Sequence, residues 1–373
     1  MKKQVIGITG PSGFIARHLI ERLGREADVT IALCPRDAWD NPLALQFFAA
    51  RCDAIVHLAG MNRGDDAEIE RVNLHLAERL VEALARTDST PHVLYASTTL
   101  RESPTAYGRS KRAAEERFRA WSESTGAPLS VLVTPNVYGA GCKPFYNSVV
   151  ATFCHQLARG EEPRVIDNRE VSLLWVGDLV DHVKKTIYDP PTGVQTIDVP
   201  GGAPLCVSDL LTMLRDFREC YFERQVVPDL SEPLRAKLYA TFLGYVELED
   251  HRHRPPVRAD HRGELFEIIK LAAGGQVFFS TTKPGVIRGD HYHTRKVEWF
   301  CVLRGDAVIR LRRVGEGTVR EFRVSGAQPE FISIPVMHTH HIENTGSEEL
   351  LTMFWTSEIF DAQDPDTHYQ KVA

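Results

Sequence analysis

Three histidines and a glutamate in the last third of the chain have the spacing of a metal site. His291 and His293 are separated by one residue, and Glu298 follows five residues after His293. Side chains alternate between the faces of a strand, so the two histidines would share one face. A turn at residues 294–296 would return Glu298 on a neighbouring strand, and His340 can supply a fourth ligand. A lone histidine is more often structural, but this set predicts a divalent metal with an open coordination position.

A second group of residues, near the N-terminus, predicts a nucleotide site. The sequence TGPSGFIA follows an apolar run typical of a strand and opens a helical pattern. Glycine lets the backbone turn tightly and approach a pyrophosphate, and the helix N-terminus offers free N–H groups. A plain turn would give the same letters, so the pattern gains its weight from following a strand. The residues expected to contact the cofactor are Gly10, Ser12, Gly13, Phe14 and Ile15.

The end of the second expected strand bears on the choice of cofactor. Arg36 stands there, and an arginine at this place suits the 2′-phosphate of NADP. Asp37 follows at once, and an acidic residue could instead accept from the ribose hydroxyls of NAD. We therefore favour NADPH and keep NAD, or a plain surface arginine, as alternatives.

A tyrosine and a lysine in the sequence SPTAYGRSK predict proton transfer to a carbonyl. Ser103 is expected to cap a helix whose first turn holds Pro104. Tyr107 and Lys111 would then lie four residues apart on one helix face. A nearby ammonium would lower the pKa of the phenol and make it a usable acid at neutral pH. Thr98, at the end of the preceding strand, could donate a hydrogen bond to the same carbonyl oxygen.

The elements that must position these groups divide the chain in two. Residues 1–200 alternate short apolar runs with helical patterns, which predicts a parallel sheet covered on both faces. Residues 205–243 have a helical pattern. Beyond a polar, basic stretch after residue 245, short β-rich runs are separated by glycines, as in an all-β barrel or sandwich. We predict domains at 1–243 and 244–373, with the basic cluster at 251–262 read as a linker and phosphate binding as its alternative.

Composition excludes several classes of protein. The formal net charge of −6 argues against a nucleic-acid partner. Seven cysteines without CxxC spacing argue against a disulfide framework or a zinc ribbon. The sequence shows no apolar run long enough for a membrane helix and no signal peptide at its start, so we expect a cytoplasmic protein without membrane contact.

Several motifs together resemble the extended short-chain dehydrogenase/reductase family, which reduces or epimerises nucleotide sugars. They are TGPSGFIA, HLAG at 57–60, the tyrosine–lysine pair and PNVYG at 135–139. The resemblance implies a Rossmann fold in which Tyr107 donates the proton, Lys111 holds the nicotinamide ribose and Thr98 orients the substrate carbonyl. Ala16 replaces the usual third glycine, and Thr134 stands where arginine is frequent. The resemblance further implies cofactor contacts from Leu58, Ala59, Gly60 and Pro135.

The second half resembles the cupin (jelly-roll) superfamily. The patterns HxHxxxxExxxxxxG, ending at Gly305, and PxxxxHxxxN, ending at Asn344, carry this resemblance. Met337 replaces a usual glycine, and His338 and His341 fall off the pattern. Residues 260–267, DHRGELFE, resemble the opening of deoxysugar epimerases of the cupin group, whose substrates are keto sugars attached to a nucleotide.

The pairing of the two domains resembles a family of bifunctional capsular-polysaccharide enzymes of the UDP-N-acetyl-L-fucosamine route. This resemblance implies NADPH-dependent reduction of a UDP-2-acetamido-2,6-dideoxy-4-keto-hexose at C4. It also implies C3 epimerisation by a zinc cupin, and a homodimer. The proton at C3 is acidic because it adjoins the ketone, and Lys296 and His338 are candidates for the base that removes it. Candidate contacts to the sugar or diphosphate are Asn136, Lys143, Asn147, Ser148 and Arg169.

Two other functions remain open from the sequence. The cupin could be a dimerisation module whose metal is structural. Alternatively, the chain could be a non-catalytic redox sensor that binds NADP and a partner, although the intact Tyr107–Lys111 pair argues against this.

Overall fold

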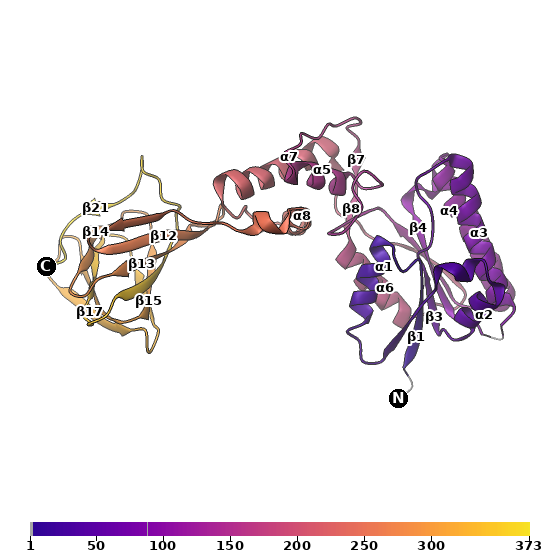
Figure 1. Ribbon diagram of the computed structural model, residues 1–373, viewed down its shortest axis with the longest axis horizontal. Coiled ribbons are helices and arrows are strands. Elements are labelled where there is room, and N and C mark those ends of the chain that lie inside the picture. Colours follow the sequence, from indigo (N-terminus) through magenta and orange to yellow (C-terminus); the bar gives the residue numbers. More distant parts are fainter. Residues whose placement is uncertain (1–2, 88) are drawn as a thin grey trace. The chain divides into compact units, whose positions relative to one another are not determined.

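The computed structural model describes residues 3–87 and 89–373 (Figure 1). By its internal contacts the chain forms two compact units: Met1–Arg215 with Lys237–Val246, and Asp216–Ala236 with Glu247–Ala373. The segment Asp216–Ala236 therefore groups with the second unit, although it precedes the expected boundary at residue 243. As a division of function, that boundary stays a prediction.

The first unit is built on six parallel strands in the order β2-β1-β3-β4-β5-β9. The chain places β2 on one side of β1 and β3 on the other. The carboxyl ends of β1 and β3 thus flank the point where the strand order reverses, where open α/β sheets bind ligands. The strands are β1 (Gln4–Thr9), β2 (Val29–Leu33), β3 (Ala54–His57), β4 (His92–Thr98), β5 (Leu129–Thr134) and β9 (Val194–Asp198).

Helices cover both faces of this sheet (Figure 1). Ile6 and Ile8 pack in a core with α1 and α6, whereas Val93 and Tyr95 pack in a second core with α2, α3 and α4. The central strands β3, β4 and β5 are buried on both faces, which explains why their sequences are largely apolar. The predicted Rossmann class is confirmed. The covering helices are α1 (Phe14–Leu23), α2 (Pro42–Ala50), α3 (Asp66–Ala85), α4 (Ala106–Thr125) and α6 (Val176–Tyr188).

Shorter elements complete the part of the chain before residue 252. β6 pairs with β8 in parallel, and β7 pairs with β10 antiparallel. The stretch expected to be helical, 205–243, contains α7, the π-helix η3 and α8. These elements are η1 (Arg36–Trp39), η2 (Thr99–Glu102), β6 (Asn136–Tyr138), α5 (Val149–Ala158), β7 (Glu170–Val171), β8 (Leu173–Trp175), β10 (Leu205–Cys206), α7 (Val207–Arg218), η3 (Glu219–Arg224), α8 (Pro233–Leu243) and η4 (Leu248–His251).

The second unit contains two antiparallel sheets. Their orders are β11-β12-β13-β20-β15-β18 and β17-β16-β19-β14-β21. One apolar core joins Phe300 and Phe354 of the first sheet to Ile309 and Ile342 of the second, so the sheets face each other as in a jelly roll. The all-β prediction is confirmed. The strands are β11 (Val257–Asp260), β12 (Gly263–Lys270), β13 (Gln276–Thr282), β14 (Ile287–Tyr292), β15 (Glu298–Arg304), β16 (Asp306–Arg313), β17 (Val319–Ser325), β18 (Phe331–Ile334), β19 (His338–Asn344), β20 (Leu350–Thr356) and β21 (His368–Tyr369).

Among the described residues, none of the helices combines the length and the apolar character needed to cross a bilayer.

Candidate active site and metal centre

The predicted glycine turn lies at the end of β1, against the chain that leaves β3. The hydroxyl oxygen of Thr9 accepts hydrogen bonds from the backbone N–H groups of Leu58 and Ala59, both at 3.0 Å. Gly10 has φ +61°, and a Cβ there would lie 2.9 Å from the Cα of Ala59. Glycine therefore suits this position for two reasons: it adopts the left-handed backbone of the turn, and it has no Cβ to clash with Ala59. The TGPSGFIA and HLAG sequences form one surface at the reversal point of the sheet.

The N-terminus of α1 opens onto this surface. Gly13 is the N-cap, its N–H donates to the carbonyl of Gly10 at 2.9 Å, and no acidic residue occupies the first turn. The first-turn N–H groups and the helix dipole thus favour a bound anion such as a pyrophosphate. Ala16, in place of the third glycine, is buried in the core between α1 and the sheet, where its small side chain fits.

Arg36 lies beyond the carboxyl end of β2, at the start of η1. Since β2 adjoins β1, this residue lies along the same sheet edge as the glycine turn. Its side chain is exposed, and within 3–87 and 89–373 it has no ion-pair partner. It is therefore available to an anionic group of a ligand. Asp37 follows it within η1 and is exposed as well.

The tyrosine–lysine pair lies in the first turns of α4. The predicted cap is wrong: Thr105, not Ser103, is the N-cap, and its hydroxyl accepts from the N–H of Gly108 at 3.1 Å. Ser103 lies before the helix. A Cβ at Gly108 would lie 2.4 Å from the carbonyl oxygen of Leu100, so glycine lets α4 approach the η2 segment that follows β4. This approach brings the first turn of α4, which carries Tyr107, against the segment that follows β4.

Burial dominates the electrostatics of this pair. The Nζ atom of Lys111 lies 4.3 Å from the centre of the Tyr95 ring, and the Tyr95 hydroxyl donates to the Lys111 carbonyl at 3.0 Å. Burial disfavours the ammonium and lowers the pKa of Lys111 to about 7. Burial, with a contribution from Tyr146, raises the pKa of Tyr107 to about 12. The predicted lowering of the tyrosine pKa is therefore wrong, because burial raises the pKa of the phenol and also disfavours the charged form of the neighbouring amine.

Thr98 ends β4 and is buried. Its hydroxyl oxygen accepts from the N–H of Leu100 at 3.2 Å, which caps η2. A hydroxyl can accept and donate at once, so Thr98 can still donate to a substrate oxygen.

Glu115 is a residue that the sequence prediction missed. Its buried carboxylate accepts from the Ser97 hydroxyl at 3.2 Å and pairs with Arg101 and Arg119 at 3.1 and 2.8 Å. It also opposes the loss of charge on Lys111 one helical turn earlier. The signal was the i, i+4 spacing of Lys111 and Glu115. This carboxylate ties the end of β4 to η2 and α4.

Some of the predicted substrate residues share a cavity. Asn136 and Arg169 line it together with Pro135, which was predicted as a cofactor contact. Thr99, which follows β4, and Asp198, which ends β9, line it as well. This cavity lies at the carboxyl edge of the sheet, next to the ends of β4, β5 and β9.

The other three predicted substrate residues do not line this cavity. Ser148 caps α5 by accepting from the N–H of Ala151 at 3.2 Å. The Nζ of Lys143 lies 5.5 Å from the centre of the Tyr146 ring, and Asn147 is exposed. These residues belong to the loop that precedes α5.

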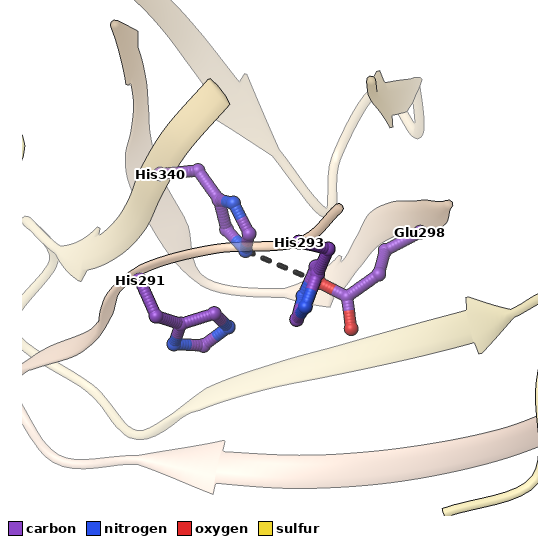
Figure 2. Close-up of side chains that lie close together, drawn as sticks. All are labelled: His291, His293, Glu298 and His340. Carbon is purple, nitrogen blue, oxygen red and sulfur yellow. Dashed lines mark ion pairs between the residues drawn. The ribbon is translucent and has the colours of Figure 1, made fainter. Parts of the chain in front are cut away.

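The four predicted metal ligands converge in the second unit (Figure 2). One potential ligand atom from each of His291, His293, Glu298 and His340 lies within 4.8 Å of the others. The chain does bend at 294–295, but Glu298 begins β15, which belongs to the sheet opposite β14. The expectation of a neighbouring strand is therefore wrong. The site is built between the two sheets.

A β-bulge in β14 aims His291 into this cluster. Gly289 pairs with His341, and the next pair is His291 with His340, so Asp290 is the extra residue. Asp290 has φ +60°. The shift places His291 opposite His340 on the inner face, as bulges near functional sites often re-aim a side chain.

The donor set fits a divalent cation. The Nε2 atoms of His293 and His340 each lie 3.1 Å from the same Glu298 oxygen, yet both are buried without a hydrogen-bond partner. The opposite ring nitrogens are satisfied: Nδ1 of His293 lies 2.5 Å from the Asp366 carbonyl, and Nδ1 of His340 lies 3.1 Å from that of His338. Because Nδ1–H donates outward, the Nε2 lone pairs face the cluster centre.

Charge in the cluster also favours a cation. Burial disfavours the Glu298 carboxylate, but the adjoining His293 and His340, when protonated, outweigh burial and hold the pKa of Glu298 well below its usual range. Burial, with repulsion from His340, lowers the pKa of His291 to about 4. At neutral pH the cluster thus offers a carboxylate and a neutral imidazole.

His338, His341 and Met337, which do not fit the cupin pattern, lie outside the cluster of four candidate ligands. His341 is buried, and its Nδ1 lies 2.9 Å from an Asp290 carboxylate oxygen, which holds the bulge. His338 is half-buried with Nδ1 2.9 Å from the Val336 carbonyl. Met337 has φ +59°, which explains why glycine is usual at its position.

Comparison with known proteins follows the same division of the chain. Residues 6–197 match the NAD dependent epimerase/dehydratase family, and residues 258–368 match the polysaccharide biosynthesis C-terminal domain. A relative from Pseudomonas aeruginosa, UDP-2-acetamido-2,6-beta-L-arabino-hexul-4-ose reductase, is 32% identical over 364 residues, 97% of each chain.

Solved structures agree with these matches. The capsular polysaccharide assembling protein CapF from Staphylococcus aureus is 33% identical, with 99% of this chain and 100% of that chain covered and a TM-score of 0.87. UDP-glucose 4-epimerase from Thermotoga maritima is 18% identical over 65% of this chain and 98% of its own, with a TM-score of 0.56, and shows the fold alone. The chain therefore belongs to the NAD dependent epimerase/dehydratase family, in the two-domain group that includes the Pseudomonas aeruginosa reductase and CapF.

Proposed function

We propose that this chain is an NADPH-dependent 4-ketoreductase of a UDP-2-acetamido-2,6-dideoxy-4-keto-hexose and that its cupin unit binds zinc and epimerises C3. The observation that carries the reductase is the Tyr107–Lys111 pair at the start of α4, together with Thr98 at the end of β4 and the glycine turn that follows β1. Similarity along the whole chain to a protein named as a 4-keto-sugar reductase supports the substrate class.

Reduction divides into a hydride and a proton. Bound NADPH supplies the hydride to C4. Tyr107 donates its phenolic proton to the C4 oxygen, and its raised pKa keeps that proton in place at neutral pH. Thr98 donates a hydrogen bond to the same oxygen and orients the carbonyl. The product is an alcohol, and the phenol then regains a proton.

Cofactor contacts follow the sheet edge. The turn after β1 and the N-terminus of α1 hold the pyrophosphate, and Arg36 binds the 2′-phosphate that distinguishes NADPH from NADH. Lys111 holds the nicotinamide ribose. The proposed contact residues are Gly10, Ser12, Gly13, Phe14, Ile15, Arg36, Leu58, Ala59, Gly60, Tyr107, Lys111 and Pro135.

The sugar nucleotide lies in the cavity lined by Asn136 and Arg169. Lys143, Asn147 and Ser148 are the second set of proposed contacts, on the loop before α5. The Arg169 guanidinium makes a loose ion pair with Asp167 at 3.9 Å, and both side chains are largely exposed. Such a pair is weak, so the guanidinium is available to bind a phosphate.

The metal would be held by His291, His293, Glu298 and His340. When bound, zinc supplies a Lewis acid that stabilises negative charge next to the labile C3–H bond. Imidazole and carboxylate donors suit zinc, although the donor types alone do not separate it from nickel, iron or manganese. Among the proposed bases, Lys296 is buried and its Nζ donates to the Pro365 carbonyl at 3.1 Å. The half-buried His338 is the more accessible of the two.

We also propose that the chain forms a homodimer. Trp299 and Phe331 are 47% and 58% exposed on adjoining strands of the six-stranded sheet, with ring centres 6.1 Å apart. An exposed aromatic surface of this kind favours association between protein chains. A cupin that serves for dimerisation and holds a structural metal is therefore the second candidate function. Light scattering during size-exclusion chromatography measures the mass that tests the dimer.

The test of the function is product analysis. The protein is incubated with a UDP-2-acetamido-4-keto-6-deoxyhexose in deuterated buffer, with and without NADPH, and the sugar is examined by NMR. We expect a C4 alcohol only with NADPH and deuterium at C3 in both samples. Reduction without deuterium at C3 would leave the dimerising cupin, and no turnover of any keto sugar would favour the redox sensor.

A further inference from the structure

Asp366 lies 73 residues beyond His293 in sequence but touches the chain between two candidate metal ligands. His293 and Glu298 flank residues 294–297, a segment outside any helix or strand. Asp366 is 5% exposed and lies in the tail that follows β20. The metal geometry depends on how this short segment is held, because it sets the separation of two of the four ligands.

The side chain of Asp366 forms hydrogen bonds with the backbone of this segment. Its carboxylate accepts from the N–H groups of Thr294, Arg295 and Lys296 at 3.0, 2.9 and 2.9 Å. It also accepts from the Thr294 hydroxyl at 2.6 Å. Three successive N–H groups directed at one anion form a nest, and charge-assisted hydrogen bonds of this kind are strong.

The backbone of Asp366 holds a ligand directly. Its carbonyl oxygen lies 2.5 Å from Nδ1 of His293, which fixes the tautomer and turns Nε2 toward the cluster. Asp366 has φ +41°, a left-handed conformation that asparagine and aspartate tolerate better than most residues. One residue therefore orients the ring of His293 and fixes the segment that leads to Glu298.

The rest of the tail supports this contact. Val372 donates its N–H to the Asp290 carboxylate at 3.1 Å, so the tail also reaches the bulge that aims His291. β21 pairs with β14 at the same place. The tail thus contacts both segments that carry the first two histidines.

We propose that Asp366 is the positioning residue of the cupin metal site, holding His293 and Glu298 at the separation that a divalent cation requires. This rests on the proposed metal site, and it extends that site to a residue outside both cupin motifs. Loss of the Asp366 carboxylate would leave all four ligand residues in the chain, but His293 and Glu298 would no longer be held at a fixed separation.

The experiment compares metal binding in Asp366→Asn with the full-length wild-type chain. Asparagine keeps the size of the side chain and tolerates the left-handed backbone. It replaces the carboxylate that accepts from the three N–H groups by a neutral amide. Asp364→Asn is the matched control, because the Asp364 carboxylate lies on the same tail and pairs with the exposed side chain of Arg295 at 2.8 Å, whereas the Asp366 carboxylate accepts from the backbone of the segment. Zn²⁺ affinity is measured by competition with a chelating dye, and the Co²⁺-loaded proteins are compared by visible absorption, which reports ligand geometry.

We expect Asp366→Asn to bind Zn²⁺ roughly 10- to 100-fold more weakly, with an altered Co²⁺ spectrum, as for other residues that orient metal ligands. Asp364→Asn should match the wild type in both measurements. Wild-type affinity and spectrum in Asp366→Asn would overturn the role of Asp366 while leaving the metal site intact. A wild-type chain that binds neither ion would overturn the metal site itself, and this role with it.

A second variant keeps the test decisive if Asp366→Asn does not fold. Thr294→Val removes only the hydroxyl contact to the carboxylate and leaves the three N–H contacts. It should weaken Zn²⁺ binding by a few-fold and shift the Co²⁺ spectrum in the same direction. An unchanged affinity and spectrum in this folded variant would count against the proposal.

Discussion

Lys111 in the first unit and Glu298 in the second are both buried ionisable groups, but their surroundings act on them differently. Lys111 packs over the Tyr95 ring, and burial brings its pKa down to about 7. Glu298 is buried as deeply, yet two imidazoles 3.1 Å away more than compensate and keep its pKa low. The first site therefore holds a cation that loses its proton near neutral pH, and the second holds an anion prepared for a cation.

This difference follows from how each site is assembled. The reductase site is made from strand ends and a helix start, and its amine enters an aromatic core. The proposed metal site brings four polar groups together between two sheets, so each compensates the others' burial. Burial of the charged Lys111 is costly in the reductase site, whereas in the His/Glu cluster neighbouring polar groups compensate the burial of the Glu298 charge. The following predictions test that contrast.

The largest effect is expected from Tyr107→Phe, which removes the proposed proton donor without changing the ring. The rate of NADPH oxidation with the keto sugar should fall about 10²- to 10⁴-fold, as is usual for loss of a general acid. Stopped-flow absorbance at the NADPH band measures it. Tyr188→Phe, on the exposed surface of α6, should keep the wild-type rate. An undiminished rate in Tyr107→Phe would remove the basis of the reductase assignment.

Glu298→Gln tests the second site. The substitution removes the only carboxylate of the four candidate ligands and should weaken Zn²⁺ binding by more than about 100-fold. Equilibrium dialysis measures the affinity. Glu343→Gln is the control, since Glu343 lies on β19 but pairs with Arg310 at 2.6 Å instead of joining the cluster. Equal affinities in the two variants would show that Glu298 is not a ligand.

Lys111→Met tests the buried cation through stability. The folded pKa of Lys111 is about 7 and its ordinary value is 10.5, so between these values the unfolded chain binds more protons. The unfolding free energy of the wild-type protein therefore rises with pH across this window. Lys111 contributes at most about 1.4 kcal/mol per pH unit to this rise.

Methionine has no such dependence, so Lys111→Met should stabilise the cofactor-free chain most at pH 7 and least near pH 10. Urea denaturation of both proteins, followed by tryptophan fluorescence at several pH values, measures the difference. A stability gain that does not shrink as the pH rises would contradict the pKa of Lys111.

The smallest effect is expected from Arg36→Ala. An exposed arginine that binds one phosphate should contribute about tenfold to the KM for NADPH, equivalent to about 1.4 kcal/mol. The KM for NADH should stay the same, which provides an internal control. Equal changes for both cofactors would mean that Arg36 does not recognise the 2′-phosphate.

Local sequence predicted the parts of these sites that depend on local geometry. The glycine turn precedes α1, Tyr107 and Lys111 lie on one helix, and the four residues of the cupin motifs cluster, as the sequence predicted. Each depends on strand ends or on helical spacing, and these are encoded within a few residues.

Features that depend on distant packing were missed. The pKa of Tyr107 was predicted in the wrong direction, because its burial depends on elements beyond its own helix. Glu298 returns on the opposite sheet, and Asp366 reaches the metal cluster from the tail. The helix cap at Thr105 replaced Ser103, since both residues are compatible caps and only the chain path chooses between them.

The central claim is that the two units divide the chemistry, with reduction at Tyr107 and proton exchange at the metal cluster. The most direct measurement is NMR of the sugar in deuterated buffer with NADPH, for Tyr107→Phe and His293→Ala in parallel. We predict that Tyr107→Phe incorporates deuterium at C3 without forming the C4 alcohol. We predict that His293→Ala forms the alcohol without deuterium at C3. Loss of both activities in either folded variant, or deuterium at C3 in His293→Ala, would contradict the division.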